Sequence, residues 1–169
     1  GGYLPLENKA LPEGTIVPAG VPLVQLENTD PRMPWLTTFI ETAMLRAIWY
    51  PTTVATLSWK CKQVIRAGLE KTSDDVEGQL PFKLHDFGAR GVSSGESAGL
   101  GGMAHLVNFM GTDTMEGLVA ARRYYDADMP GFSAGEQHYV DNTAILVTTL
   151  TSPDGATIRV TDFAPRFKQ

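Results

Sequence analysis

Cysteine is almost missing from this sequence: Cys61 is the only one in 169 residues, so no disulfide can form within the chain. Residues 1–5 also lack the basic and apolar stretches of a secretory signal peptide. Together these absences predict a protein of the reducing cytoplasm. We expect Cys61 to be a buried or half-buried small apolar residue, because that is a far commoner role for a lone cysteine than that of a nucleophile.

Long apolar runs and an excess of positive charge are lacking as well. No run approaches the roughly 18 apolar residues that a membrane-spanning helix needs, so we expect no membrane partner. Lys and Arg number 14 against 19 Asp and Glu. This balance argues against a nucleic-acid partner, because the phosphate backbone attracts basic surfaces. What is present is an ordinary globular composition, with 43% hydrophobic and 20% charged residues.

The first part of the chain, residues 1–80, has the pattern of a β-hairpin followed by helices. Runs of β-forming residues around the Pro-Ala-Gly stretch at 18–20 predict a hairpin within residues 5–29. Apolar residues in adjacent pairs every four positions predict a helix over residues 35–49, which Pro51 ends or kinks. A second helix is expected over residues 53–70. The candidate N-caps and first-turn prolines are Asn28, Thr29, Asp30, Pro31 and Pro34.

Residues 81–135 alternate between strand and helix patterns. Short strands are expected at 82–87 and at 108–110. Between them, many small residues predict close packing of a helix that begins at Ser94. A turn at 111–114, with Thr112 or Asp113 as N-cap, leads into a helix that continues to Tyr124. This order predicts an α/β fold with a parallel sheet or barrel.

The last part, residues 136–169, does not continue this alternation. The stretch 143–150 is rich in β-forming residues, and residues 157–161 alternate between apolar and polar. A Ser-Pro-Asp-Gly turn sequence lies between them at 152–155. This pattern predicts a C-terminal β-hairpin.

The middle part offers candidate site residues at the ends of its strands. Arg90 lies at the mouth of the Gly-rich loop, where a guanidinium and a helix N-terminus could hold a phosphate, although a solvated surface charge is the commoner role. Asp113 could accept hydrogen bonds from an amide or could simply cap a helix. Phe87 could stack on a flat heterocycle or pack in the core. His85 and His105 are expected to be structural, because their spacing fits no metal motif.

Several stretches, taken together, resemble nicotinamide phosphoribosyltransferase. The most distinctive are KLHDFG at 83–88, RGVSS at 90–94 and GTDT at 111–114. The others lie at 4–7, 10–14, 27–31, 49–56, 104–109 and 124–125. The resemblance covers roughly residues 2–134 and rests on the order and spacing of these stretches as well as on their content.

The resemblance implies a reaction that joins nicotinamide to phosphoribosyl pyrophosphate, with Mg²⁺ accompanying the pyrophosphate. The products are nicotinamide mononucleotide and pyrophosphate, and the reaction serves NAD salvage. The implied fold is a partial type II phosphoribosyltransferase, with a β-rich and helical flanking region and part of an irregular α/β barrel. The implied assembly is a homodimer with active sites at the subunit interface.

The resemblance also gives roles to individual residues. Phe87 would stack on the pyridine ring, and Arg90 would contact substrate phosphate or the nicotinamide region. Asp113 would accept a hydrogen bond from the carboxamide, which favours nicotinamide over nicotinate. Ser133 would approach the ligand from the next loop. No residue is assigned to a metal.

Two departures from the family pattern affect the site. Ala89 stands where the family usually has an aromatic residue. After Ser133 the family continues to a catalytic histidine in a Glu-His context, whereas here His138 follows Glu136-Gln137. His138 is therefore only a weak candidate, and the catalytic residue stays unassigned.

The tail has a resemblance of its own. Residues 137–146 and 158–167 resemble the N-terminal β-sandwich of family-fifteen glycoside hydrolases, the glucoamylase and trehalase group. We therefore predict a truncated or chimeric chain, with a junction near residues 133–137 and little activity alone. Two alternatives stay open: a non-catalytic remnant that binds ligand or dimerises, and a carbohydrate-active β-sandwich module carried by the tail.

Overall fold

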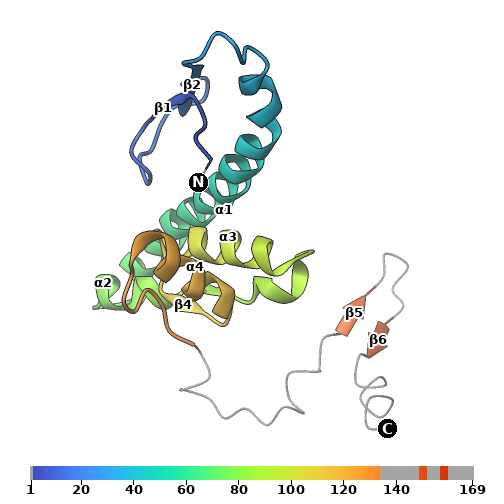
Figure 1. The fold of residues 1–169 in the computed structure, drawn as a ribbon. Helices are drawn as coiled ribbons and strands as arrows, with labels where there is room; N and C mark the ends of the chain where they lie inside the picture. Colours follow the sequence, from blue (N-terminus) through green and yellow to red (C-terminus); the bar gives the residue numbers. More distant parts are fainter. Residues whose placement is uncertain (1, 134–148, 152–156, 160–169) are drawn as a thin grey trace, which may run out of the picture. The chain divides into compact units, whose positions relative to one another are not determined.

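The computed structural model describes residues 2–133, 149–151 and 157–159. The chain separates into two compact units, Gly1–Phe132 and Ser133–Gln169. The first unit is a mixed helix–strand fold, shown from blue to orange in Figure 1. The three-part division predicted from the sequence, at residues 80/81 and 135/136, stays a prediction.

The N-terminal hairpin pairs β1 (Leu6–Ala10) with β2 (Val24–Asn28) in antiparallel register. The hairpin is confirmed, but its first strand lies earlier than the run at 14–17 that was expected to form it. The intervening loop contains Pro12, Pro18 and Pro22, which lack the N–H that a sheet ladder needs. The loop therefore turns instead of pairing.

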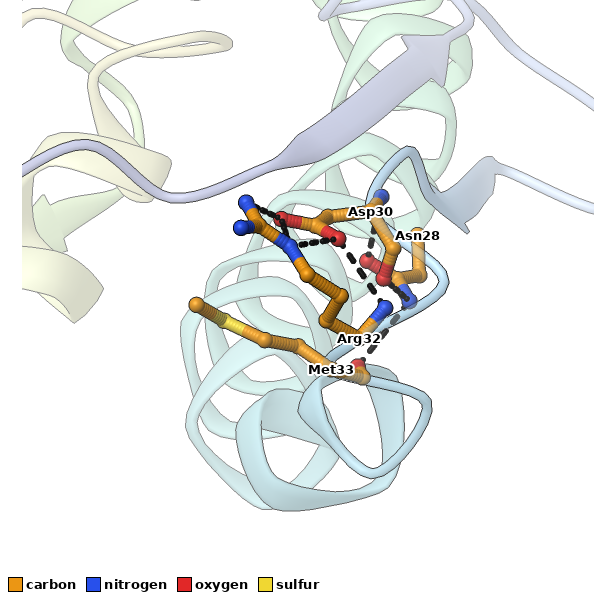
Figure 2. A network of polar contacts seen from close by, with 4 residues as sticks. All are labelled: Asn28, Asp30, Arg32 and Met33. Atoms are coloured by element: carbon orange, nitrogen blue, oxygen red, sulfur yellow. Dashed lines mark hydrogen bonds and ion pairs between the residues drawn. The ribbon is translucent and has the colours of Figure 1, made fainter.

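A polar network closes the turn that follows β2 (Figure 2). The Asn28 side-chain amide donates to the backbone oxygens of Asp30 at 2.7 Å and Met33 at 2.9 Å. The Arg32 guanidinium donates to the Asp30 carboxylate, with Nη2 and Oδ2 2.7 Å apart, and this bond lowers the pKa of Asp30. The expectation that residues 28–30 cap the first helix is wrong. The side chains of Asn28 and Asp30 bond within the turn, and Trp35 precedes the helix without a side-chain cap.

One long helix, α1 (Leu36–Thr72), replaces the two helices predicted on either side of Pro51. Proline removes a single intrahelical N–H, and packing beside it offsets that loss. Tyr50, next to Pro51, lies against α3, since a Cβ built on Gly101 would come within 2.6 Å of the Tyr50 hydroxyl. Cys61 is exposed on this helix, so its predicted burial is also wrong.

After α1 the chain alternates short strands with helices, as the sequence predicted in outline. The elements are α2 (Val76–Gln79), η1 (Leu80–Phe82), β3 (His85–Asp86), η2 (Gly88–Gly91), α3 (Gly95–His105), β4 (Gly111–Thr112) and α4 (Met115–Tyr125). Strands β3 and β4 pair in parallel, with His85 opposite Gly111 and Asp86 opposite Thr112. Phe132 pairs in parallel with Gly111, on the other edge of β4.

The boundaries in this part differ from those expected. The predicted strand at 82–87 shortens to β3, because its first residue belongs to η1. The strand predicted at 108–110 is wrong, since those residues precede β4. Ser94 caps α3 as expected, its hydroxyl accepting from the Ser97 N–H at 3.1 Å. Thr112 and Asp113 do not cap α4, which follows Thr114.

Helices α3 and α4 pack with their backbones in contact. A Cβ on Gly102 would come within 2.9 Å of Gly117 Cα, and a Cβ on Gly117 within 2.8 Å of the Gly102 carbonyl carbon. This contact confirms the close packing predicted from the small residues of 88–102. Leu80 and Phe109 are among the most buried side chains of the described residues, each 1% exposed.

A polar clamp joins α1 to the segment between α3 and β4. Lys62 Nζ donates to the Asn108 backbone oxygen at 2.7 Å. The Asn108 side-chain amide donates to Ala55 O at 2.9 Å and to Ser58 Oγ at 2.7 Å. The Lys62 ammonium also lies 5.7 Å from the centroid of the Phe109 ring. The start of β4 is thereby fixed relative to α1.

His105, at the end of α3, supports β4 from inside the fold. Its side chain is buried, and Nε2 lies 3.0 Å from the Gly111 backbone oxygen. Burial lowers the pKa of His105, and the bond to Gly111 opposes this only in part. The neutral imidazole is therefore the form that the folded state favours. The structural role expected for His105 is confirmed.

The second unit contains the described strands β5 (Thr149–Thr151) and β6 (Thr157–Arg159). They pair in antiparallel register with Leu150 opposite Ile158, which confirms the predicted hairpin at these residues. The rest of that prediction, at 143–148, 152–156 and 160–161, lies outside the described residues. In the described part, no helix combines the length and apolar character needed to cross a membrane.

We predict that Asn108→Ala lowers the free energy of unfolding by about 1–3 kcal/mol, because it removes two hydrogen bonds at the partly buried contact with α1. Urea denaturation followed by tryptophan fluorescence measures this, since Trp35, Trp49 and Trp59 lie at or in α1. Gln63→Ala is the matched control: its 3.5 Å bond to Trp59 O is exposed, and the expected change is within about 0.5 kcal/mol. Equal effects of the two changes would contradict the clamp.

A second prediction concerns pH. The unfolded chain protonates His105 near its ordinary pKa of 6.5, whereas the folded chain does so only at lower pH. Between these values the unfolded state holds more protons, so the stability contributed by neutral His105 is complete above 6.5 and is lost as pH falls through the folded pKa. The urea concentration at the unfolding midpoint should decrease as pH is lowered across this range. The decrease should be smaller in His105→Gln. An identical slope in that variant would rule His105 out as the cause.

Candidate functional site

The parallel pair β3–β4 brings two of the predicted site residues to the same edge of the fold. Phe87 directly follows β3 and Asp113 directly follows β4. The Asp113 N–H donates to Asp86 O at 2.9 Å, so the ladder continues to the point where Asp113 begins. Carboxyl ends of parallel strands are the usual location of binding residues in α/β folds.

A tight turn brings the Arg90 side chain close to the Phe87 ring. Asp86 Oδ1 accepts from the Gly88 N–H at 2.7 Å, which turns the chain into η2. In a 3₁₀ helix, residues three apart lie one above the other. The Arg90 guanidinium accordingly lies 5.7 Å from the centroid of the Phe87 ring, within the range of a cation–π contact. The Phe87 side chain remains half exposed.

His85 connects this pair to Asp113. Its ring lies 4.6 Å from the Phe87 ring, centroid to centroid, with 39° between the planes. Its Nε2 lies 3.2 Å from Asp113 Oδ1. Arg90, Phe87, His85 and Asp113 thus form one continuous row of contacts, which we call the strand-end cluster.

Sequence reasoning missed His85, which it grouped with the structural histidines. The missed signal was its spacing, because His85 and Phe87 are two residues apart and lie on the same face of a strand. The sequence predicts that Phe87, Arg90 and Asp113 meet around one space the size of a pyridine ring. Phe87 contacts Arg90 and His85, and His85 contacts Asp113, but the shared space stays a prediction. Their roles in binding stay predictions.

The cluster borders a nearby cavity through His85, and its other members lie outside the lining of that cavity. That cavity, about 300 Å³, has a lining that includes His85 and Asp86 but not Phe87, Arg90 or Asp113. It is bounded by α1, β3 and α3. The side chains of His85 and Asp113 retain 18% and 30% exposure. A flat ligand would therefore meet the cluster at an open surface.

Two other predicted site residues, Ser133 and His138, are not part of the strand-end cluster. Ser133 follows Phe132, which pairs with β4, but it is the first residue of the second unit, so its role at the ligand stays a prediction. His138 lies outside the described residues. Among the described residues, no three His, Cys, Asp or Glu side chains gather as a metal site.

Comparison with known proteins gives first a class and then the family to which the chain belongs. The nicotinate phosphoribosyltransferase (NAPRTase) family matches residues 82–144, the region that contains the strand-end cluster. The mixed helix–strand fold and this match indicate a phosphoribosyltransferase. The match continues past residues 133–137, where the sequence predicted a junction.

Curated relatives are more specific, and they confirm the resemblance to nicotinamide phosphoribosyltransferase. A protein of that name from Xanthomonas campestris pv. campestris is 47% identical over 173 residues, covering 96% of this chain. One from Acinetobacter baylyi is 38% identical over 126 residues, covering 75% of this chain. The chain spans 37% and 25% of the lengths of these two relatives.

Proposed function

We propose that this chain is the nicotinamide-binding part of a nicotinamide phosphoribosyltransferase. The whole enzyme would join nicotinamide to phosphoribosyl pyrophosphate and release nicotinamide mononucleotide and pyrophosphate, as in NAD salvage. The observation that carries the proposal is the strand-end cluster, in which an exposed aromatic ring and a carboxylate both contact His85 at the ends of paired strands. The resemblance supports the assignment of the ligand.

Each member of the cluster has chemistry that suits this substrate. The half-exposed ring of Phe87 offers a face on which a pyridine ring can stack. The Asp113 carboxylate only accepts hydrogen bonds, so it suits the NH₂ of a carboxamide and repels the carboxylate of nicotinate. The Arg90 guanidinium can hold a phosphate with two parallel hydrogen bonds.

The cluster would act mainly by positioning nicotinamide for the reaction. The pyridine nitrogen forms a bond to the anomeric carbon of the ribose while the bond from that carbon to the pyrophosphate oxygen breaks, and pyrophosphate leaves with the electron pair. Stacking on Phe87 and the bond to Asp113 fix the direction in which the nitrogen points, which removes much of the orientational entropy from the barrier. Arg90 places a positive charge near the phosphates.

Several wider features belong to this proposal. The parallel positions of β3, β4 and Phe132 would be neighbouring strands of the irregular α/β barrel. The whole enzyme would be a homodimer, with Ser133 at the ligand. Mg²⁺ would arrive with phosphoribosyl pyrophosphate, since among the described residues no three His, Cys, Asp or Glu side chains gather as a metal site.

We predict that nicotinamide binds this chain and that Asp113→Ala weakens the binding about 10-fold to 100-fold, because a hydrogen bond to a charged group contributes about 1.5–3 kcal/mol. Isothermal titration calorimetry with nicotinamide and nicotinate measures both affinities. In Asp113→Asn the preference for nicotinamide should narrow, because the negative charge that repels nicotinate is gone. Asp128→Ala, at a fully exposed carboxylate, is the matched control and should bind as the unaltered chain does.

Nicotinamide affinity that is unchanged in Asp113→Ala would remove Asp113 from the site. Because the chain spans about a third of its Xanthomonas relative, we expect no mononucleotide from the chain alone with phosphoribosyl pyrophosphate and Mg²⁺. Binding without turnover would fit a part of the enzyme or a ligand-binding remnant, whereas turnover would show that the chain is sufficient for catalysis.

A further inference from the structure

We infer that His85 is a positioning residue, which holds the Asp113 carboxylate in the direction that selects an amide over an acid. This inference rests on the proposed function. The His85 imidazole contacts the Phe87 ring, and its Nε2 contacts Asp113.

The chemistry of the pair fixes which group donates. An ionised carboxylate has no hydrogen to give, so the hydrogen of the 3.2 Å contact must lie on His85 Nε2. A ring nitrogen that donates to Asp113 Oδ1 fixes the carboxylate plane, and it leaves the negative charge in place. A fixed, charged acceptor is what discriminates the NH₂ of nicotinamide from the carboxylate of nicotinate.

Gly111 makes this reach across the sheet possible. It is the residue opposite His85 in the β3–β4 register. A Cβ at Gly111 would lie 2.6 Å from His85 Nδ1, closer than any side chain could tolerate. The imidazole therefore lies directly over the Gly111 backbone, and this places Nε2 beside Asp113, which is two residues after Gly111 and directly follows β4.

The same ring supports the stacking platform. With centroids 4.6 Å apart, His85 packs against one part of the Phe87 ring, while Arg90 lies 5.7 Å from its centroid. Loss of the Nε2–H donor would release the carboxylate, whereas an apolar side chain of similar bulk would keep the packing against the phenyl ring. The affinity for nicotinamide and the preference for nicotinamide over nicotinate should therefore change together. A purely structural residue would not change that preference.

Calorimetry with nicotinamide and nicotinate on the full chain tests the inference. His85→Leu, which keeps bulk but has no donor, should weaken nicotinamide binding about tenfold and narrow the preference over nicotinate. His85→Gln, whose amide can donate at a similar reach, should recover most of both. Gly111→Ala, which displaces the imidazole without removing it, should resemble His85→Leu.

A double-mutant cycle separates positioning from independent binding. If His85 acts through Asp113, then His85→Leu should change nicotinamide affinity less than about twofold in an Asp113→Ala background. A tenfold further loss in that background would overturn the inference. So would nicotinamide and nicotinate affinities in His85→Leu that equal those of the unaltered chain.

NMR distinguishes failure of this inference from failure of the proposed function. Long-range ¹H–¹⁵N correlations, assigned by comparison with His85→Gln, should show the Nε2–H tautomer in the unaltered chain and a change in Asp113→Ala. An unaltered chain that binds no nicotinamide would refute the proposed function, and the spectra would still decide whether Asp113 holds His85. Spectra that are identical with and without Asp113 would overturn the inference by themselves.

Discussion

The pairing of β3 with β4 is the constraint on which the rest of the site depends. The ladder is only two residue pairs long, and the Asp113 N–H extends it by one bond to Asp86. Because the strands are parallel, the residues that follow them leave the sheet at the same edge. Phe87 and Asp113, 26 positions apart in the sequence, become neighbours for this reason alone.

So short a ladder needs support from the elements around it. His105 bonds to the Gly111 carbonyl from the end of α3, and Asn108 fastens the preceding segment to α1. Phe132 pairs with the other edge of β4. Each contact fixes β4 at a different point. The backbone position of Asp113 is therefore set by these surrounding contacts more than by the two-residue strand itself.

The strand-end cluster combines side chains whose preferences differ. A carboxylate rejects anions, whereas a guanidinium attracts them, and the ring of Phe87 lies between them in the row of contacts. A neutral carboxamide on an aromatic ring, joined to a phosphorylated sugar, satisfies all three at once. Under the proposed function, this arrangement would let one small surface prefer an uncharged ring and still hold phosphate nearby.

Much of this could be read from local sequence. The helix that Ser94 opens, the close packing of α3 on α4 and the hairpin of the tail follow from capping, small side chains and alternation, which act between near neighbours. The candidate residues Phe87, Arg90 and Asp113 were also recognisable, because the resemblance lies in short stretches with fixed spacing.

Other features depend on contacts between distant parts of the chain. Pro51 marks a helix end by local rules, but α1 continues through it because Tyr50 beside it packs against α3. Asn28 looks like a helix cap, but its side chain instead accepts from the Asp30 N–H and donates to Met33 O within a turn. The strand expected at 108–110 moved to β4, where β3 and Phe132 supply its partners.

The sequence by itself determined the mixed helix–strand class, the elements with strong local signals and the choice of three candidate site residues. Only the tertiary structure decided that His85 joins them, because its contacts require β3 and β4 to be in register and Gly111 to leave room for the ring. Local patterns encode which backbone each segment prefers, whereas the meeting of side chains depends on how separate segments pair, and no short stretch of sequence contains that information.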